Sequence, residues 1–370
     1  MRVIISGGGT GGHIYPAIAI ANKIKKENPK ASILFIGTEK GMEKDIVPKE
    51  GYEIKTIKVS YLKRKISIHN IKSAGMLLQG LWQSRKIIKD FKPDIVIGTG
   101  GFVSGPVLYV ASKMGIKTII HEQNVFPGIA NKILGNYVDR IAISFEEAER
   151  YFKHKNKLVV TGNPIRETFL TISKEEGKRR YKSKTNNPLV LVVGGSGGSI
   201  SINRAISDLL IKQPNIKFEI LLVTGKKHYH QVMETISKKQ EIVQHHTIQE
   251  YINDMPYALK ACDLIICSAG AITITEINAV GKPAILIPKA YTAENHQEYN
   301  ARALEARGAA LVIKERDLNS GTLLTNMQQI FATKEKLEAM KKASLDASKK
   351  HATDKIYHQV IELINKEIVH

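Results

Sequence analysis

Residues that build disulfide scaffolds and metal centres are scarce in this sequence of 370 residues. Cysteine occurs only at Cys262 and Cys267. Their spacing fits no zinc or disulfide framework and both flank an apolar run, so we expect buried free thiols in a reducing compartment. No Asp-x-Asp sequence occurs, and the histidines lack the spacing of metal ligands. We therefore expect no metal centre.

Long apolar runs and aromatic residues are also few. No segment reaches the roughly 20 apolar residues that a membrane-spanning helix needs. Met1 and Arg2 lead directly into an apolar, strand-like run, which argues against a signal peptide. Aromatic residues make up 6% of the chain and no nucleic-acid-binding motif is recognisable, so nucleic acid is not the expected partner. A soluble chain in the cytoplasm is the expectation.

Acidic residues are outnumbered by basic ones. The chain has 35 Asp and Glu against 55 Lys and Arg, which gives a net charge of +20. Such an excess is typical of proteins that meet a polyanion: a nucleic acid, an anionic membrane face or a phosphorylated substrate. A lysine-rich surface that meets only solvent is the alternative explanation.

Apolar runs of strand length alternate with amphipathic stretches of helix length. Because these runs are apolar throughout, they indicate strands buried on both faces of a parallel sheet, and hence an α/β fold. The expected strands cover 2–6, 32–37, 93–100, 117–122, 140–144 and 157–162 in the first half, and 189–195, 218–225, 264–270, 283–288 and 310–314 in the second.

The start of the chain has a counterpart in its middle. Residues 3–16 and 190–205 each run from a strand through a glycine loop into a helix, which predicts two Rossmann-like, doubly wound domains. Asn163 and Pro164 break any helix and mark the boundary, giving an N-terminal domain of residues 1–163 and a C-terminal domain of residues 164–351. A final helix, about 352–370, has the apolar spacing to pack back on the N-terminal domain.

Four glycine loops follow expected strands and precede expected helices: 7–13, 98–106, 194–199 and 268–271. Glycine loops and helix N-termini attract phosphate, because they present backbone N–H groups to it. Ligands of open α/β sheets bind at the carboxyl ends of the strands, so these loops predict a cleft that holds an anionic ligand.

The first loop also fits the G-x-G-x-x-G pattern of dinucleotide-binding oxidoreductases, with Glu39 as a ribose-binding acid. Three observations count against that interpretation. The second half carries a phosphate loop of its own, and His13 follows the last glycine at a point where a pyrophosphate needs open access. The loop 98–106 adds a further polar backbone surface in the same domain, which a dinucleotide site leaves unexplained.

Motifs along nearly the whole chain resemble those of the bacterial peptidoglycan N-acetylglucosaminyltransferases of the MurG type. They are GGGTGGHIYPA, GTGGFVSGP, HEQNVFPGIANK, GNPIR, GGSGGS, CSAGAITITE and NHQEYNA, in the order of the family. The resemblance implies the GT-B fold, in which two Rossmann-like domains with parallel sheets face each other across a deep cleft. It also implies inverting transfer of GlcNAc from UDP-GlcNAc to the 4-hydroxyl of the muramoyl sugar of lipid I. The product is lipid II, used in peptidoglycan synthesis and hence in cell shape and division.

An inverting transfer needs a base for the acceptor hydroxyl and a stabilised UDP leaving group. His13 is the first candidate for the base, since an unperturbed imidazole titrates near pH 6.5. Glu122 is the rival base, and Asn124 is expected to orient the acceptor. A purely hydrogen-bonding role remains open for His13, as does a structural role for the HEQN segment.

The resemblance also implies the two binding sites. Acceptor and diphosphate are expected at Gly9, Thr10, Gly100, Gly101, Phe102 and Ser104. The donor UDP-GlcNAc is expected at Thr10, Gly11, Gly12, Asn124, Arg166, Ser196, Gly197, Gly198, Ile252, Met255, Ala271, Ile272, Thr273, Glu276, His296 and Gln297.

Among the donor residues, Ser196 and the following N–H groups are expected to hold the diphosphate, with positive charge from Arg166. Glu276 is expected to accept hydrogen bonds from the ribose; complementing the helix dipole is its alternative role. The family usually has Gln where this chain has Gly197, so a side-chain contact from that position is lost. No metal or other cofactor is expected at the donor diphosphate.

A basic and apolar segment covers residues 49–92, with eleven Lys or Arg against three Asp or Glu. A helix within it predicts an apolar ridge with cationic edges, as on proteins that bind anionic membranes. An ordinary core-facing helix is the alternative. The residues expected at the membrane are Met76, Leu77, Leu81, Trp82, Arg85, Lys86 and Lys89.

The expected partners are therefore UDP-GlcNAc, lipid I, the anionic cytoplasmic face of the cell membrane and other cell-wall or division proteins. Two alternatives stay open. One is an enzyme that resembles a UDP-GlcNAc 2-epimerase, and the other is a non-enzymatic basic protein that binds a sugar nucleotide or nucleic acid.

Overall fold

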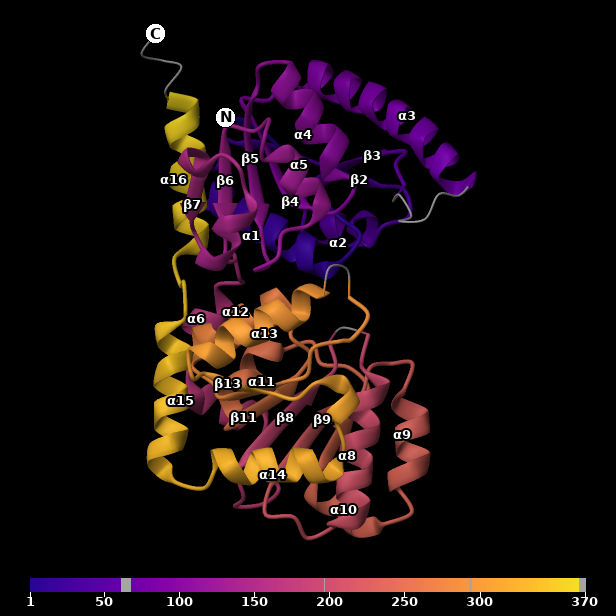
Figure 1. Cartoon of the computed structure of the whole chain (residues 1–370), viewed down its shortest axis with the longest axis vertical. Helices are drawn as coiled ribbons and strands as arrows, with labels where there is room; N and C mark the ends of the chain where they lie inside the picture. Colours follow the sequence, from indigo (N-terminus) through magenta and orange to yellow (C-terminus); the bar gives the residue numbers. More distant parts are fainter. Residues whose placement is uncertain (61–67, 196, 293–294, 366–370) are drawn as a thin grey trace. The chain divides into compact units, whose positions relative to one another are not determined.

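A computed structural model describes residues 1–60, 68–195, 197–292 and 295–365 of the chain. The chain divides into two compact units (Figure 1). The N-terminal unit combines Met1–Ile165 with His351–His370, and the second unit is Arg166–Lys350.

The N-terminal unit is built on a seven-stranded sheet in the order β3-β2-β1-β4-β5-β6-β7. All neighbouring strands are parallel. The strands are β1 (Arg2–Gly7), β2 (Ser32–Thr38), β3 (Glu53–Ile57), β4 (Ile95–Gly100), β5 (Lys117–Glu122), β6 (Arg140–Ile143) and β7 (Leu158–Val160).

Helices cover both faces of this sheet. Val3 and Ile5 of β1 pack with α1 (Gly11–Glu27) and α16 (Ala352–Asn365), while Ile4 packs on the opposite face. That opposite face carries α3 (Ile68–Phe91), α4 (Ser104–Lys113) and α5 (Ile129–Leu134). The unit is completed by α2 (Glu43–Lys49) and the 3-10 helices η1 (Glu146–Tyr151) and η2 (Lys155–Lys157).

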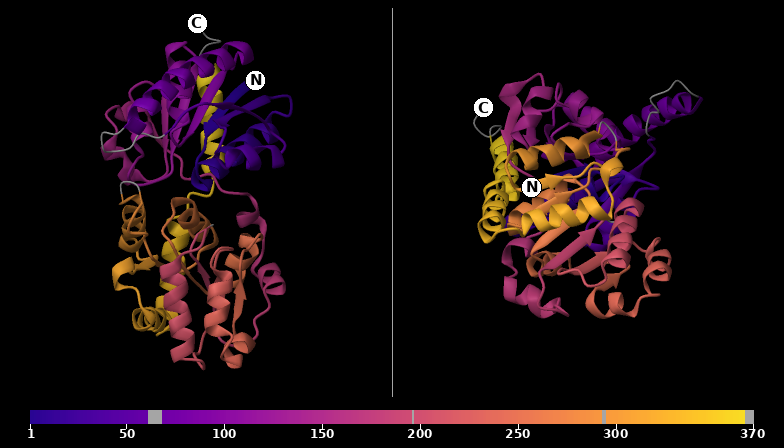
Figure 2. Two further views of the ribbon diagram at one scale, coloured as in Figure 1. Left: turned by 90° about the vertical axis from the view of Figure 1, so that its right-hand side faces the viewer. Right: turned by 60° about the horizontal axis from the view of Figure 1, so that its bottom comes forward.

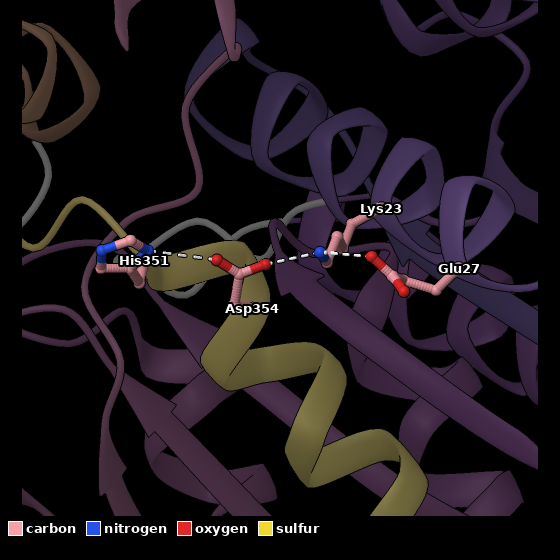
Figure 3. Close-up of polar contacts among 4 residues, drawn as sticks. All are labelled: Lys23, Glu27, His351 and Asp354. Carbon is pink, nitrogen blue, oxygen red and sulfur yellow. Dashed lines mark hydrogen bonds and ion pairs between the residues drawn. The ribbon is translucent and has the colours of Figure 1, made fainter.

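Helix α16 runs along the sheet of the N-terminal unit, in yellow in Figures 1 and 2. Its Ile356 and Val360 are fully buried there. A row of polar contacts joins it to α1 (Figure 3): the Lys23 ammonium lies 2.6 Å from Asp354 and 2.7 Å from Glu27, and the ring of His351 lies 3.3 Å from Asp354. Its hydrogen bond to Asp354 is the largest influence that raises the pKa of Lys23.

The second unit has a six-stranded parallel sheet in the order β10-β9-β8-β11-β12-β13. Counted from the first strand of each unit, both sheets read 3-2-1-4-5-6, the order of a doubly wound fold, with β7 added to the first. The strands are β8 (Leu189–Val193), β9 (Glu219–Val223), β10 (Thr247–Gln249), β11 (Leu264–Cys267), β12 (Ala284–Leu286) and β13 (Ala310–Val312).

Ten α-helices of the described residues belong to the second unit. They are α6 (Thr168–Thr171), α7 (Lys174–Arg180), α8 (Ile200–Lys212), α9 (Tyr229–Ile236), α10 (Gln240–His245), α11 (Met255–Ala261), α12 (Ala271–Val280), α13 (His296–Ala306), α14 (Ser320–Ile330) and α15 (Lys334–Asp346), with the 3-10 helix η4 (Glu315–Asp317).

The fold confirms the predicted α/β class and all eleven predicted strands. Two strands, β3 and β10, were not predicted, and both lie at the outer edge of a sheet. Cys262 and Cys267 are buried free thiols as predicted, and burial raises the pKa of Cys262 to about 11. Among the described residues, none of the helices has the length and apolar character to cross a membrane.

Candidate functional site

The predicted glycine loops follow the central strands of the two sheets. In the N-terminal unit they follow β1 and β4, and in the second unit β8 and β11. Strands β1 and β4 are neighbours, yet the helices that follow them cover opposite faces of the sheet. Such a change of direction opens a crevice at the carboxyl ends of the strands, where doubly wound proteins bind ligands.

In the first loop the backbone is prepared for an anion. Gly9 has φ = 83°, and Thr10 is the N-cap of α1 with no side-chain capping bond. The N–H groups of His13 and Ile14 both bond to the Thr10 carbonyl. Among the described residues, nothing accepts the N–H groups of Gly11 and Gly12, and the first turn of α1 carries no acid. These N–H groups and the helix dipole form an anion-binding end.

A buried acid that the sequence interpretation missed organises this loop. Glu43 is fully buried at the start of α2 and accepts the N–H of Gly9 at 3.0 Å. Its other oxygen accepts the N–H and the hydroxyl of Thr38, at 2.9 and 2.7 Å. A Cβ atom on Gly8 or Gly41 would collide with this carboxyl group. The N–H of Gly9, predicted to contact the diphosphate, is therefore already engaged.

The second loop packs against the first. Gly100 and Gly101 have φ angles of 103° and 82°, and a Cβ on Gly101 would collide with the carbonyl of Gly8. Ser104 is buried, and its hydroxyl donates to the carbonyl of Gly100 at 2.6 Å. Phe102 remains 37% exposed beside them. The loops after β1 and β4 thus form one preformed surface of backbone groups. The hydroxyl of Ser104 is buried beneath it, against the Gly100 carbonyl.

His13 is held in one tautomer. Its Nδ1 lies 3.1 Å from the carbonyl oxygen of Thr99, and the Thr99 hydroxyl donates to the His13 carbonyl at 2.8 Å. A carbonyl only accepts, so the proton sits on Nδ1 and Nε2 becomes the basic nitrogen. A Cβ on Gly100 would lie 2.7 Å from Nδ1, so glycine there makes room for the ring.

A network of buried polar side chains is hydrogen-bonded to the Thr99 carbonyl. The Gln123 amide donates to it at 2.6 Å and lies 3.1 Å from Nδ1 of His121. Nε2 of His121 lies 3.0 Å from the Gly162 carbonyl, which fixes the opposite tautomer to that of His13. Burial lowers the pKa of His121 to about 4, so this ring stays neutral.

Glu122 and Asn124 form a separate, saturated cluster. The Glu122 carboxylate is 1% exposed and accepts four N–H groups: the backbone and side chain of Asn124 at 2.9 and 3.1 Å, the backbone of Gly128 at 3.1 Å and the side chain of Asn131 at 2.8 Å. A carboxylate so engaged has little capacity to accept a substrate proton. The geometry therefore favours His13 over Glu122 as the base.

In the second unit, the loop after β8 has two glycines in the left-handed region, Gly195 at φ = 90° and Gly198 at φ = 80°. Within the part of the chain that the structure describes, a Cβ on Gly197 would meet no atom within 4 Å, so open space lies beside this glycine. Ser199 caps α8 by accepting the N–H of Ile202. Ser196, predicted to hold the donor diphosphate, lies outside the described residues.

The loop after β11 leads into α12. Its first turn carries no acid, with Ala271 buried and Ile272 and Thr273 partly exposed. Glu276, in the second turn, is partly buried. Desolvation raises the pKa of its carboxyl group to about 7, while the positive charge of Arg166 acts in the opposite direction.

The remaining predicted donor residues lie near the ends of other helices of this unit. Ile252 is 8% exposed, and Met255 begins α11. His296 begins α13, and the Gln297 side chain accepts the backbone N–H of Lys289 at 3.0 Å. Lys289, which the sequence interpretation missed, also reaches the loop after β8: its ammonium lies 3.5 Å from the Gly198 carbonyl.

Helix α3 carries the predicted membrane residues. Trp82 is 63% exposed and Leu77 39%, while Arg85, Lys86 and Lys89 are exposed. Met76 and Leu81 are partly buried, and Leu81 packs against the core. These two residues therefore expose less apolar surface to a membrane than predicted. Leu78, not predicted, is 69% exposed and extends it.

No group of three metal-binding side chains occurs within the part of the chain that the structure describes. Comparison with protein families matches residues 3–143 to the glycosyltransferase family 28 N-terminal domain and residues 189–356 to the glycosyltransferase family 28 C-terminal domain.

Two similar curated proteins are both named UDP-N-acetylglucosamine--N-acetylmuramyl-(pentapeptide) pyrophosphoryl-undecaprenol N-acetylglucosamine transferase. The protein from Alkaliphilus oremlandii is 61% identical over 99% of this chain and 100% of its own length. The protein from Alkaliphilus metalliredigens is 59% identical over 98% of this chain and 100% of its own length.

Solved structures share the fold at lower identity. MurG of Acinetobacter baumannii superposes with a TM-score of 0.75 at 23% identity, over 98% of this chain and 99% of that chain. A UDP-GlcNAc 2-epimerase from Neisseria meningitidis gives 0.69 at 16% identity, over 98% and 100%.

Proposed function

This chain belongs to glycosyltransferase family 28, and from that premise we propose that it transfers GlcNAc from UDP-GlcNAc to the 4-hydroxyl of undecaprenyl-diphosphate-linked MurNAc-pentapeptide. Identity of 59–61% to transferases along their entire length carries the proposal. The epimerase shares 16% identity, which supports a common fold alone. The chain is thus a glycosyltransferase of peptidoglycan synthesis, and its product is lipid II.

The N-terminal unit provides the acceptor site and the base. Gly11 and Gly12 were expected at the donor. Because no described group accepts their N–H groups and they form the anion-binding end of α1, we place the acceptor diphosphate there instead, beside the loop Gly100–Gly101. Nε2 of His13 takes the proton of the acceptor hydroxyl as its oxygen attacks C1 of GlcNAc and the bond from C1 to UDP breaks. The attack comes from the side opposite UDP, so the configuration inverts. The bond from Nδ1 to the Thr99 carbonyl stabilises the imidazolium that forms.

The second unit holds the donor. The N–H groups of the loop 194–199 and the guanidinium of Arg166 neutralise the UDP diphosphate without a metal ion. Glu276 accepts the ribose hydroxyls in its ionised form, Ile252 and Met255 contact uracil, and Gln297 contacts the sugar. The leaving UDP takes the electron pair of the broken bond, and these donors stabilise its negative charge.

The site of action is the cytoplasmic face of the cell membrane. The exposed Leu78 and Trp82 are one helical turn apart on α3, and Lys86 and Lys89 continue the same side of the helix. An apolar ridge edged by cations enters the headgroup region of an anionic bilayer. There it meets an acceptor anchored by a polyprenyl chain.

Incubation with labelled UDP-GlcNAc and a lipid I analogue, with and without EDTA, tests this proposal. We expect a labelled disaccharide lipid in both reactions. Release of N-acetylmannosamine would indicate an epimerase instead. Binding of UDP-GlcNAc without turnover would indicate a binding protein, and activity lost in EDTA but restored by magnesium would contradict the metal-free account.

A further inference from the structure

Lys289 lies close to the glycine loop that follows β8, although no motif in the sequence pointed to this lysine. It follows β12 closely in the chain, so it reaches the same carboxyl edge of the sheet as the loop after β8. Its side chain is partly buried. The ammonium lies 3.5 Å from the Gly198 carbonyl and 4.0 Å from the place where a Cβ on Gly195 would be.

The position of Lys289 is set by its backbone. Its N–H donates to the Gln297 side chain at 3.0 Å, and the next N–H, of Ala290, donates to Glu315 at 3.0 Å. The other oxygen of Glu315 accepts the hydroxyl of Ser201, in the first turn of α8. Glu315 thus ties the segment that carries Lys289 to the helix that follows the glycine loop.

The ammonium of Lys289 has no anionic partner among the described residues. No described carboxylate lies within ion-pair distance, and the carbonyl at 3.5 Å is at the limit of hydrogen bonding. Glu315, nearby in the fold, is occupied by Ser201 and Ala290. A half-buried lysine with no carboxylate partner loses part of its solvation free energy. An anion bound to the glycine loop after β8 would compensate for this loss.

We propose that Lys289 is a fixed cation of the donor diphosphate and contacts a phosphoryl oxygen of UDP-GlcNAc above the backbone of Gly195, Gly197 and Gly198. The inference rests on the proposed donor site of the second unit. The open space above Gly197 is where the diphosphate lies. Negative charge grows on the distal phosphate as the bond from GlcNAc C1 to UDP breaks, so a cation there stabilises both the bound donor and the leaving group.

Paired substitutions separate a charge contact from a role in holding the loop. Lys289→Gln keeps a hydrogen-bond donor for the Gly198 carbonyl but removes the charge, and Lys289→Arg keeps the charge. Binding of UDP, UMP and uridine is measured by calorimetry. For Lys289→Gln we expect UDP affinity to fall about ten- to a hundredfold, with uridine affinity unchanged and UMP affected less than UDP. Lys289→Arg should restore most of the UDP affinity.

Lys212→Gln is the matched control, because Lys212 ends α8 about 18 Å from the loop and loses the same charge. It should bind all three ligands as the unaltered enzyme does. Unchanged UDP affinity in Lys289→Gln, or an equal loss for uridine and UDP, would overturn the inference. If the unaltered chain itself binds no UDP, the proposed donor site fails first, so the two failures are distinguishable.

Discussion

The Nδ1 atom of His13 lies 3.1 Å from the carbonyl oxygen of Thr99, and this contact decides which imidazole nitrogen is basic. Gln123 donates to the same oxygen at 2.6 Å and carries the network on to the neutral His121. The ring is therefore oriented by a backbone atom, which no substitution of Thr99 removes directly. Such rigid placement is what a general base requires.

Replacing His13 should impair chemistry more than binding. In His13→Ala we expect kcat to fall about 10²–10⁴-fold, because a general base contributes on that scale. The KM for UDP-GlcNAc should change little. The measurement is steady-state kinetics across pH, in which the imidazole-like acidic limb of kcat should vanish. A variant that keeps both near-normal kcat and that limb would remove His13 from the chemistry.

Glu122 should prove structural. Glu122→Gln presents an amide NH2 group to N–H donors of Asn124, Gly128 or Asn131, so some of these groups lose their acceptor. We expect a loss of about 1–3 kcal/mol in the free energy of unfolding. The acidic limb of the kcat profile should remain in the folded fraction. Loss of that limb in a variant of normal stability would restore Glu122 as the base.

Strands with a buried interior are readable from sequence because every residue of the run is apolar. All five residues of β8 are buried, for example, and LVLVV stands out in the chain. The edge strand β3 instead alternates exposed and partly buried residues before the buried Ile57 in EIKTI. Strand β10, TIQ, has Ile248 as its single apolar residue, whereas the equally short β7, β12 and β13 are apolar throughout. A strand with interspersed polar residues leaves a signal that resembles a loop.

The loops of the candidate site were predictable where backbone geometry imposes a pattern, as the positive φ angles of Gly9 and Gly198 do by requiring glycine. Glu43 and Lys289 were not predicted, because each contacts a loop that is distant in the sequence. Glu43 lies 34 positions from Gly9, and Lys289 lies 91 positions from Gly198. Such contacts arise only when the sheet brings separate segments together. On α3, spacing alone did not reveal that Leu81 packs on the core while Leu78 is exposed.

The membrane surface of α3 can be tested with two double variants. Leu78→Ser with Trp82→Ser, and Lys86→Glu with Lys89→Glu, should each reduce binding to anionic vesicles in a sedimentation assay. A cation near the surface contributes about 1 kcal/mol. Activity on a short-chain acceptor should survive. Lys334→Glu with Lys342→Glu, on exposed positions of α15, makes the same charge change and should bind normally. Equal losses in both lysine pairs would mean that net charge, not this surface, drives binding.

Glu43 should position the acceptor loop. Glu43→Gln leaves one oxygen for three donors, those of Gly9 and Thr38. We expect the KM for the lipid acceptor to rise about tenfold, consistent with one lost hydrogen bond to a charged group, while UDP affinity stays unchanged. Thr38→Val removes one donor and keeps the bond to Gly9, so its acceptor KM should remain near normal. An unchanged acceptor KM in Glu43→Gln would limit Glu43 to a structural role.

Glu276 should show opposite effects on stability and on donor binding. Its folded-state pKa of about 7 exceeds the ordinary glutamate pKa of 4.5, so between these pH values the folded state binds more protons than the unfolded state. Stability therefore falls as pH rises through this window, by about 1–3 kcal/mol. Glu276→Gln removes the titration, so the variant should lose this decline and be the more stable protein at pH 8, as measured by denaturant unfolding.

Donor affinity should change with pH in the direction opposite to stability, because the ribose hydroxyls donate to the ionised carboxylate of Glu276. UDP affinity of the unaltered enzyme should rise with pH through about 7, the value to which desolvation raises the pKa of Glu276. In Glu276→Gln that rise should disappear and affinity at pH 8 should be about ten- to a hundredfold lower. Calorimetry with UDP at pH 6 and pH 8 gives both quantities. If the variant matches the unaltered enzyme in UDP affinity at pH 8 while gaining stability, Glu276 does not contact the ribose.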